Sequence, residues 1–161
     1  KEESMKKNGP NINAKSKKLD MKWIRTPKII WDELSKEFNF TVDACASDKN
    51  HLLPKYWTKE NSALDKNWDN EVVYCHPMYD IYIPKFIEKA INSKCLAVFL
   101  LPASTHTKYF HDFIYHNPNC EIRFLRKPVK GFRFGHDNGT EDDPNKIAYI
   151  KPLMIIIFRN K

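Results

Sequence analysis

The run CLAVFLLP, residues 95–102, constrains the fold of this chain more than any other segment. It contains no charged side chain and shows no alternation of apolar and polar residues. A strand with one solvated face alternates, whereas an unbroken apolar run of this length fits a strand buried on both faces. The run therefore predicts a central strand in a sheet that is covered on both sides.

Segments of helical and extended character alternate around this strand. TPKIIWDELSKEF (26–38) predicts a helix, with Thr26 as its cap and Pro27 in its first turn. Two further helices are predicted at residues 83–91 and 107–116, and further strands at 38–43, 71–75, 120–125 and 153–158. This alternation predicts an α/β domain with three αβα layers and a mixed, mostly parallel sheet.

Length and charge suggest one folded domain preceded by a basic arm. The 161 residues suit a single core, and we expect residues 21–161 to form it. Residues 1–20 are rich in lysine and poor in apolar side chains, which predicts a disordered arm, either a solvated tail or a segment attracted to phosphate. The net charge of +7 permits a polyanionic partner. No apolar run approaches the roughly 18 residues of a membrane span.

The cysteines and histidines do not predict a metal site. None of the four cysteines forms a C-x-x-C pair, so we expect free thiols in a reducing compartment. His106, His111 and His116 recur every five residues, a spacing that does not place them on one helical face. Only four glycines occur and no G-x-G-x-x-G is present, so dinucleotide binding lacks its usual signal.

Two polar segments are candidates for binding a small molecule. Asp43 ends a predicted strand, and the small residues Ala44 and Cys45 after it leave room for a ligand near the backbone. The carboxylate would accept from an ammonium or hydroxyl group, or it is simply a turn acid. Asn61 and Asp65 flank apolar residues and suit an adenosine moiety; a capped surface turn explains the same spacing equally well.

The stretch VVYCHPMYD, residues 72–80, is the candidate for catalysis. The exocyclic amino nitrogen of a base is a poor nucleophile, because its lone pair is delocalised into the ring. Acceptors around its two hydrogens favour a more pyramidal nitrogen, and His76 and the Pro77 carbonyl are candidates for these acceptors. Tyr79 follows Met78 and offers a ring to stack on a flipped base. An ordinary exit from a strand into a loop would have the same residues.

A basic and aromatic segment near the C-terminus is a candidate nucleic-acid surface. Cations that meet phosphate alternate there with rings that meet bases. An edge strand with its phenylalanines turned inward is the alternative. The basic residues are Arg123, Arg126, Lys127, Lys130 and Arg133.

The order of these pieces resembles the phage-type DNA N-6-adenine methyltransferase family, also called the phage Dam family. The matching pieces are WIRTP, EFNFTVDACAS, NSALDKNW, VVYCHPMY, IPKFIEKA, LLPASTHTKYFH, EIRFL, GFRFG and LMIIIF, from about Trp23 to Phe158. The resemblance implies a Rossmann-like fold, S-adenosylmethionine as methyl donor, and transfer to N6 of a flipped adenine in double-stranded DNA. It also implies a protein of the cytoplasm of a bacterial or phage-infected cell.

The resemblance assigns roles to residues in order along the chain. Thr26 and Pro27 would lie near the donor, Asp43, Ala44 and Cys45 would line its site, and Asn61 and Asp65 are weaker candidates there. His76, Pro77, Met78 and Tyr79 occupy the catalytic tetrapeptide, which the family usually writes as Asn-Pro-Pro-Tyr or Asp-Pro-Pro-Tyr.

His76 and Met78 depart from the family's usual tetrapeptide. A protonated histidine donates rather than accepts, so activity should fall as the pH drops through its titration. The departures keep two alternatives open: an inactive methyltransferase fold that binds nucleic acid or protein, and an enzyme acting on cytosine N4 or an RNA base.

Overall fold

The computed structural model of the chain describes residues 24–79, 81–126, 129–134, 146–149 and 151–160. The predicted basic arm therefore lies outside the described residues. The described part contains two helices of nine or ten residues and two β-sheets, one of five strands and one of three. This mixed α/β architecture confirms the predicted class. None of the described helices has both the length and the apolar character that a membrane crossing requires.

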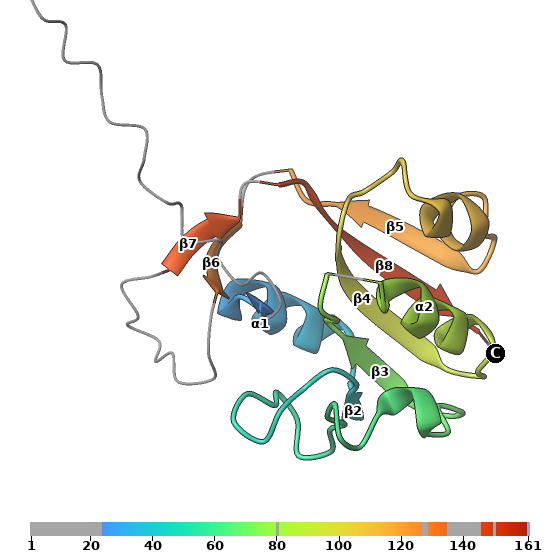
Figure 1. Cartoon of the computed structure of the whole chain (residues 1–161), viewed down its shortest axis with the longest axis horizontal. Coiled ribbons are helices and arrows are strands. Elements are labelled where there is room, and N and C mark those ends of the chain that lie inside the picture. The colour runs from blue at the N-terminus through green and yellow to red at the C-terminus, as the bar shows by residue number, and fades with distance from the viewer. Residues whose placement is uncertain (1–23, 80, 127–128, 135–145, 150, 161) are drawn as a thin grey trace, which may run out of the picture.

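The five-stranded sheet is ordered β2-β3-β4-β8-β5 (Figure 1). Strands β2, β3 and β4 are parallel, and β8 is antiparallel to both of its neighbours, so β5 runs in the same direction as β4. The strands are β2 (Val42–Asp43), β3 (Val72–Cys75), β4 (Leu96–Pro102), β8 (Leu153–Arg159) and β5 (Cys120–Phe124).

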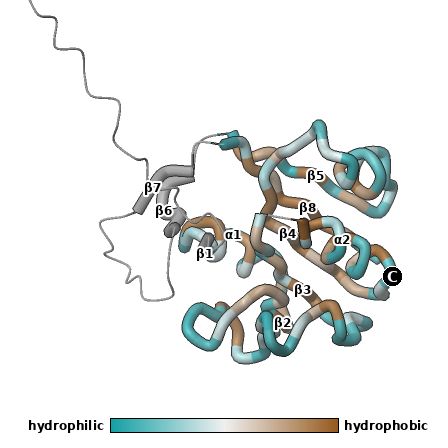
Figure 2. The backbone as a smooth tube through the Cα atoms, in the orientation of Figure 1, coloured by the Kyte–Doolittle hydropathy of each residue, from teal (hydrophilic) through white to brown (hydrophobic). Residues whose placement is uncertain are grey.

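Alternating residues of the sheet enter two separate apolar cores. On one face, Phe99 and its neighbours pack with α2 (Ile83–Ile91) and η2, a π-helical turn (Phe110–Ile114). On the other face, Leu100 and its neighbours pack with α1 (Lys28–Glu37). Five residues of β4 are buried, which confirms the strand that its apolar run predicts. Figure 2 shows the resulting brown, apolar centre of the sheet.

The three-stranded sheet was not predicted as a unit. It pairs β1 (Ile24–Arg25) with β6 (Val129–Phe134) and β6 with β7 (Lys146–Tyr149), all antiparallel. Figure 1 shows β6 and β7 beside α1, apart from the larger sheet. The small sheet joins the segment before α1 to a segment more than a hundred residues later, a pairing that local sequence patterns do not encode.

One local prediction was wrong, and one predicted helix is shorter than expected. Thr26 does not cap α1: Pro27 is the N-cap residue, and the helix has no side-chain cap. The Thr26 hydroxyl instead bonds to two distant side chains. The helix predicted at residues 107–116 is a short segment with a π-helical turn, in which the N–H of Tyr115 reaches back to the carbonyl of Phe110.

Candidate active site

Three of the parallel strands deliver polar residues or chain turns to one edge of the sheet. Asp43 is the last residue of β2, His76 directly follows β3, and Pro102 ends β4. The register pairs Asp43 with Tyr74 and Cys75 with Phe99, so these strand ends are adjacent. Ligands of open parallel sheets bind at this carboxyl edge. The candidate site is therefore built from the loops that follow β2 and β3.

A chain of four side-chain hydrogen bonding groups runs through this edge. The hydroxyl oxygens of Tyr74 and Thr26 lie 2.7 Å apart, and Thr26 Oγ1 lies 2.8 Å from Nδ1 of His76. On the other side of the imidazole, Nε2 lies 2.9 Å from the hydroxyl of Tyr79. Both ring nitrogens of His76 are thus engaged by protein groups.

Local structure explains why these groups meet. Side chains two residues apart on a strand point to the same face, so Tyr74 and His76 share one side of β3. That face is covered by α1, and Thr26 lies two residues before the helix begins. The Tyr74 ring contacts Trp31 and Phe40 edge-on, at centroid distances of 5.1 and 5.4 Å. These contacts hold the phenol in place from the α1 side.

Burial decides the charge of this group of side chains. His76 is 7% exposed, and burial lowers its pKa to about 3. Tyr74 is fully buried, and burial holds its pKa well above the usual value. Both side chains are therefore neutral near pH 7. Protonation of His76, and the loss of activity expected from it, should therefore occur at strongly acidic pH and not in the ordinary histidine range.

Asp43 organises the loop after β2. Its carboxylate accepts from the N–H of Cys45 at 3.3 Å and from the N–H of Leu52 at 3.0 Å. The side chain is 3% exposed, and burial raises its pKa, an effect that the two N–H donors oppose. The turn-acid interpretation is thus realised in the structure. A carboxylate offers about four acceptor positions, so Asp43 retains capacity for a ligand donor.

Two thiols lie between the two strand ends. Sγ of Cys45 and Sγ of Cys75 are 3.4 Å apart, and both cysteines are free. Cys75 is buried, which raises the pKa of its thiol well above the usual value, and Cys45 is partly exposed. The small residue Ala44 continues the ladder, because its N–H donates to the carbonyl of Tyr74. The segment 43–45 therefore lies directly against the end of β3.

The structure does not join Asn61 and Asp65 to this cluster. Both residues are exposed, and Asp65 ends the 3-10 turn η1 (Ala63–Asp65), which Ser62 caps by accepting from the N–H of Leu64. Among the described residues, no hydrogen bond links the side chains of Asn61 or Asp65 to segment 43–45. The capped-turn interpretation accounts for the local geometry.

The predicted nucleic-acid residues differ in their surroundings. Arg123 on β5 donates to both carboxylate oxygens of Glu37, at 2.6 and 2.7 Å, and to Glu121 at 2.5 Å. Arg126 is exposed just beyond β5. Lys130 and Arg133 lie within strand β6, and Lys127 lies outside the described residues.

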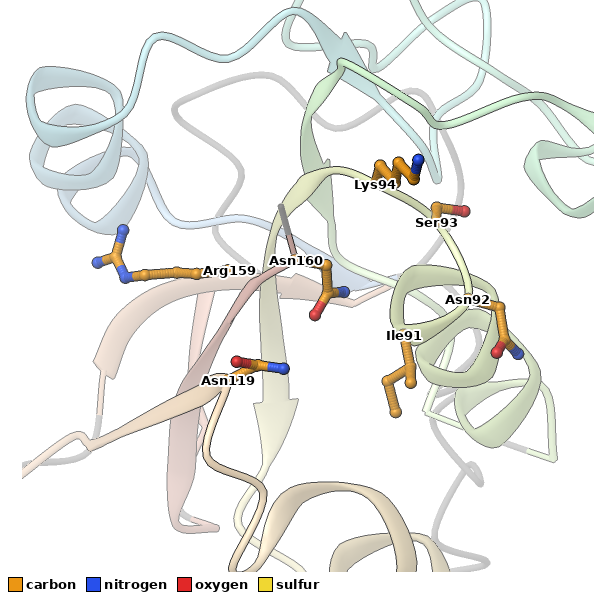
Figure 3. Close-up of a pocket in the computed structure, with 7 residues that line it drawn as sticks. All are labelled: Ile91, Asn92, Ser93, Lys94, Asn119, Arg159 and Asn160. Carbon is orange, nitrogen blue, oxygen red and sulfur yellow. The ribbon is translucent and has the colours of Figure 1, made fainter.

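A separate surface cavity lies at the opposite edge of the sheet. It has a volume of about 560 Å³ and is lined by residues 91–94 after α2 and by Asn119, Arg159 and Asn160 (Figure 3). These residues stand near the start of β4 and the end of β8, whereas His76 follows the far end of β3. The cavity is therefore distinct from the candidate site. In the described part of the chain, no group of three metal-ligating side chains is placed to hold an ion.

Tyr74 is the site residue that sequence reasoning missed. It lies inside the run VVYC, where a tyrosine fits the pattern of a buried strand as well as an apolar residue does. The available signal was its position two residues before His76, which places its hydroxyl on the same face of the strand. A buried phenol requires a hydrogen-bond partner, so this position predicts a polar group nearby.

Comparison with known proteins identifies the chain's relatives. The DNA N-6-adenine-methyltransferase of Haemophilus phage HP1 is 28% identical over 154 residues, which cover 92% of this chain and 84% of the relative. The DNA N-6-adenine-methyltransferase of Escherichia phage T1 is 32% identical over 75 residues, covering 44% of this chain and 31% of the relative. A family model described as DNA N-6-adenine-methyltransferase (Dam) matches residues 13–161. The match spans the loop of His76 and nearly the whole chain, and the chain therefore belongs to the Dam family of DNA N-6-adenine-methyltransferases.

Proposed function

We propose that this chain transfers a methyl group from S-adenosylmethionine to the N6 amino nitrogen of adenine in double-stranded DNA. The observation that carries the proposal is the family match across residues 13–161, which includes the loop after β3. The names of the two phage relatives support the same reaction. Residues 21–161 would form the methyltransferase domain, acting in the cytoplasm of a bacterial or phage-infected cell.

The proposed fold is the Rossmann-like, three-layer arrangement of S-adenosylmethionine-dependent methyltransferases. Three parallel strands at the start of the sheet support it, together with helices packed against opposite faces. In such a fold the donor would bind across the carboxyl ends of β2 and β3. Thr26, Pro27, Ala44 and Cys45 are the residues we assign to the walls of this site.

Asp43 is the proposed anchor for the donor. The donor supplies an electrophilic methyl group on a positively charged sulfur, and it also carries an ammonium group and two ribose hydroxyls. The buried carboxylate at the end of β2 fits such a ligand, since it is the acidic side chain next to the small residues 44 and 45. Asn61 and Asp65 are exposed and are weaker candidates for contacts to the adenosine part.

The loop of residues 76–79 is the proposed binding site for the target adenine. The Pro77 carbonyl would accept one N6 hydrogen whatever the pH. Neutral His76 would accept the other only through a ring nitrogen that carries no proton. Tyr79 would stack on the flipped base, with Met78 packed beside it. After transfer, the methylated nitrogen returns to neutrality by losing one hydrogen as a proton to solvent.

Duplex DNA is the proposed partner, with the adenine flipped out of the helix. Ile81, three residues after Met78, is 79% exposed. An exposed apolar side chain beside the loop suits contact with an unstacked base step. The basic residues Arg123, Arg126, Lys127, Lys130 and Arg133 would contact phosphates.

A methyl-transfer assay tests the proposal. Purified protein, tritiated S-adenosylmethionine and unmethylated duplex DNA should give label that appears as N6-methyladenine after digestion. DNA already methylated at N6 serves as the matched control and should accept little label. Transfer only to cytosine or to RNA would contradict the adenine assignment.

An inactive binding module is the second candidate, because His76 and Met78 replace the usual residues of the tetrapeptide. Calorimetry with the donor and with duplex DNA separates this candidate from the first. Binding of either ligand without any methyl transfer would support the module and exclude the enzyme.

A further inference from the structure

The direction of the hydrogen bonds from Tyr74 to Tyr79 can be worked out from the buried end. The Tyr74 hydroxyl is fully buried, and within the part of the chain that the structure describes its hydrogen-bond partner is Thr26 Oγ1. A phenol that only accepted this bond would bury an unsatisfied O–H, at a cost of about 1–3 kcal/mol. Tyr74 therefore donates to Thr26.

The Thr26 hydroxyl is the donor of the next bond. A threonine hydroxyl has one hydrogen to donate. With Tyr74 donating to it, Thr26 has its own hydrogen available for Nδ1 of His76, 2.8 Å away. The opposite arrangement would make Thr26 accept from both neighbours and would leave its hydrogen without either of them. In the arrangement in which both hydroxyls donate, Nδ1 of His76 is the acceptor and carries no proton.

We propose that Tyr74 and Thr26 are positioning residues that hold neutral His76 as the tautomer protonated on Nε2. In this tautomer the Nε2–H donates to the hydroxyl oxygen of Tyr79, 2.9 Å away. The order of donation is Tyr74 to Thr26, Thr26 to His76, and His76 to Tyr79. These three hydrogen bonds thus fix both the proton of the imidazole and the position of the Tyr79 phenol, which is proposed to stack on the base.

This tautomer has a consequence that rests on the proposed function. An Nε2 that carries hydrogen cannot accept a hydrogen from N6 of adenine. For Nε2 to become an acceptor, the bonds of His76 to Thr26 and to Tyr79 must both reverse, and the Thr26 hydrogen is then donated to neither neighbour. The Pro77 carbonyl is then the acceptor available without reversal. Tyr74 therefore lowers the rate of methyl transfer by selecting the His76 tautomer, and it does not contact the base itself.

Nitrogen NMR of the histidine rings tests the tautomer without any need for methyl transfer. The chain has six histidines, and the His76 signals are those absent from the His76→Asn variant. In the wild-type protein near neutral pH, Nε2 should resonate as a protonated nitrogen and Nδ1 as an unprotonated one. The reverse assignment would overturn the proposal, whether or not the protein proves to be an enzyme.

Tyr74→Phe is the discriminating variant. It removes one hydroxyl and leaves the ring that packs on Trp31 and Phe40. Thr26 then no longer receives a hydrogen bond from Tyr74, and a population protonated on Nδ1 should appear. Thr26→Ser keeps the hydroxyl and should retain the wild-type tautomer. An unchanged His76 spectrum in folded Tyr74→Phe protein would overturn the proposal.

Kinetics supply a second readout if the protein methylates DNA. Tyr74→Phe should raise kcat several-fold with little change in KM for DNA, because Nε2 becomes available as an acceptor. The same substitution in a His76→Asn background should have no such effect, since asparagine has no tautomer to select. An equal effect of Tyr74→Phe in both backgrounds would show that it acts independently of His76, contrary to the proposal.

Discussion

At the residue scale, position 76 controls the acceptor geometry of the proposed site. The imidazole is buried and neutral, and both its nitrogens bond to protein hydroxyls. An asparagine side chain carries an oxygen that accepts whatever the pH. We therefore expect His76→Asn to keep or raise kcat for adenine methylation in the tritium-transfer assay.

A Pro-containing variant is the matched control for that experiment. Met78→Pro restores the second usual residue of the tetrapeptide without changing the acceptor at position 76, and proline stiffens the loop. If both single variants and their combination leave an inactive protein inactive, the enzymatic proposal fails at this site.

Replacement of Asp43 is expected to affect both stability and donor binding. An amide at this position accepts through one oxygen only, so Asp43→Asn leaves one of the N–H groups of Cys45 and Leu52 facing an NH₂ group. We expect the free energy of unfolding to fall by about 1–3 kcal/mol, and donor affinity to fall at least tenfold.

Urea unfolding and donor calorimetry measure the two effects of Asp43→Asn. Asp65→Asn is the control, because Asp65 is exposed and ends a surface turn; its unfolding free energy should not change. Donor affinity that survives Asp43→Asn in folded protein would remove Asp43 from the proposed site.

At the element scale, strand β5 and the segment just after it contain two arginines that should behave differently. Arg123 is already paired with Glu37 and Glu121, so its charge is largely neutralised within the protein. Arg126 is exposed beyond the strand. We expect Arg126→Ala to weaken DNA binding and lower the slope of log affinity against log salt by about one.

Arg123→Ala should instead act on stability. Its partners are partly exposed, so the free energy of unfolding should fall by about 1 kcal/mol or less. DNA affinity at several salt concentrations, measured by fluorescence anisotropy, separates the two variants. An equal salt-slope change in both would mean that phosphate competes successfully with Glu37 for Arg123.

At the scale of the whole molecule, the buried imidazole should make stability depend on pH. The pKa of His76 is about 3 in the folded protein, against 6.5 for the ordinary side chain. Between these values the unfolded chain binds a proton that the folded chain does not, so stability falls as the pH falls. The loss is roughly 1.4 kcal/mol per pH unit once the unfolded histidine is mostly protonated.

Comparison of wild type with His76→Asn isolates this contribution from other titrating groups. From about pH 7 to about pH 5, wild type should lose about 2 kcal/mol more than the variant in urea unfolding. Equal pH dependence of the two proteins would mean that His76 is accessible to protons in the folded state.

Sequence patterns were sufficient for much of the architecture. The apolar run at 95–102 predicted the central strand β4, and the spacing of Ile83, Ile87 and Ala90 predicted α2. The order of the pieces predicted the family, which the match over residues 13–161 confirms. The assigned roles of His76, Pro77, Met78 and Tyr79 remain predictions, as do those of the donor-site and DNA-binding residues.

The sequence by itself determined the main elements of the larger sheet, its two apolar faces and the family, because these depend on short-range periodicity and on the order of segments. Only the tertiary structure decided the partners of Thr26. That residue looked like a helix cap, yet its hydroxyl bonds to side chains 48 and 50 positions away. The physical reason is that a hydroxyl bonds to whichever buried polar groups the packing brings within 3 Å of it, and packing depends on contacts that no local pattern encodes.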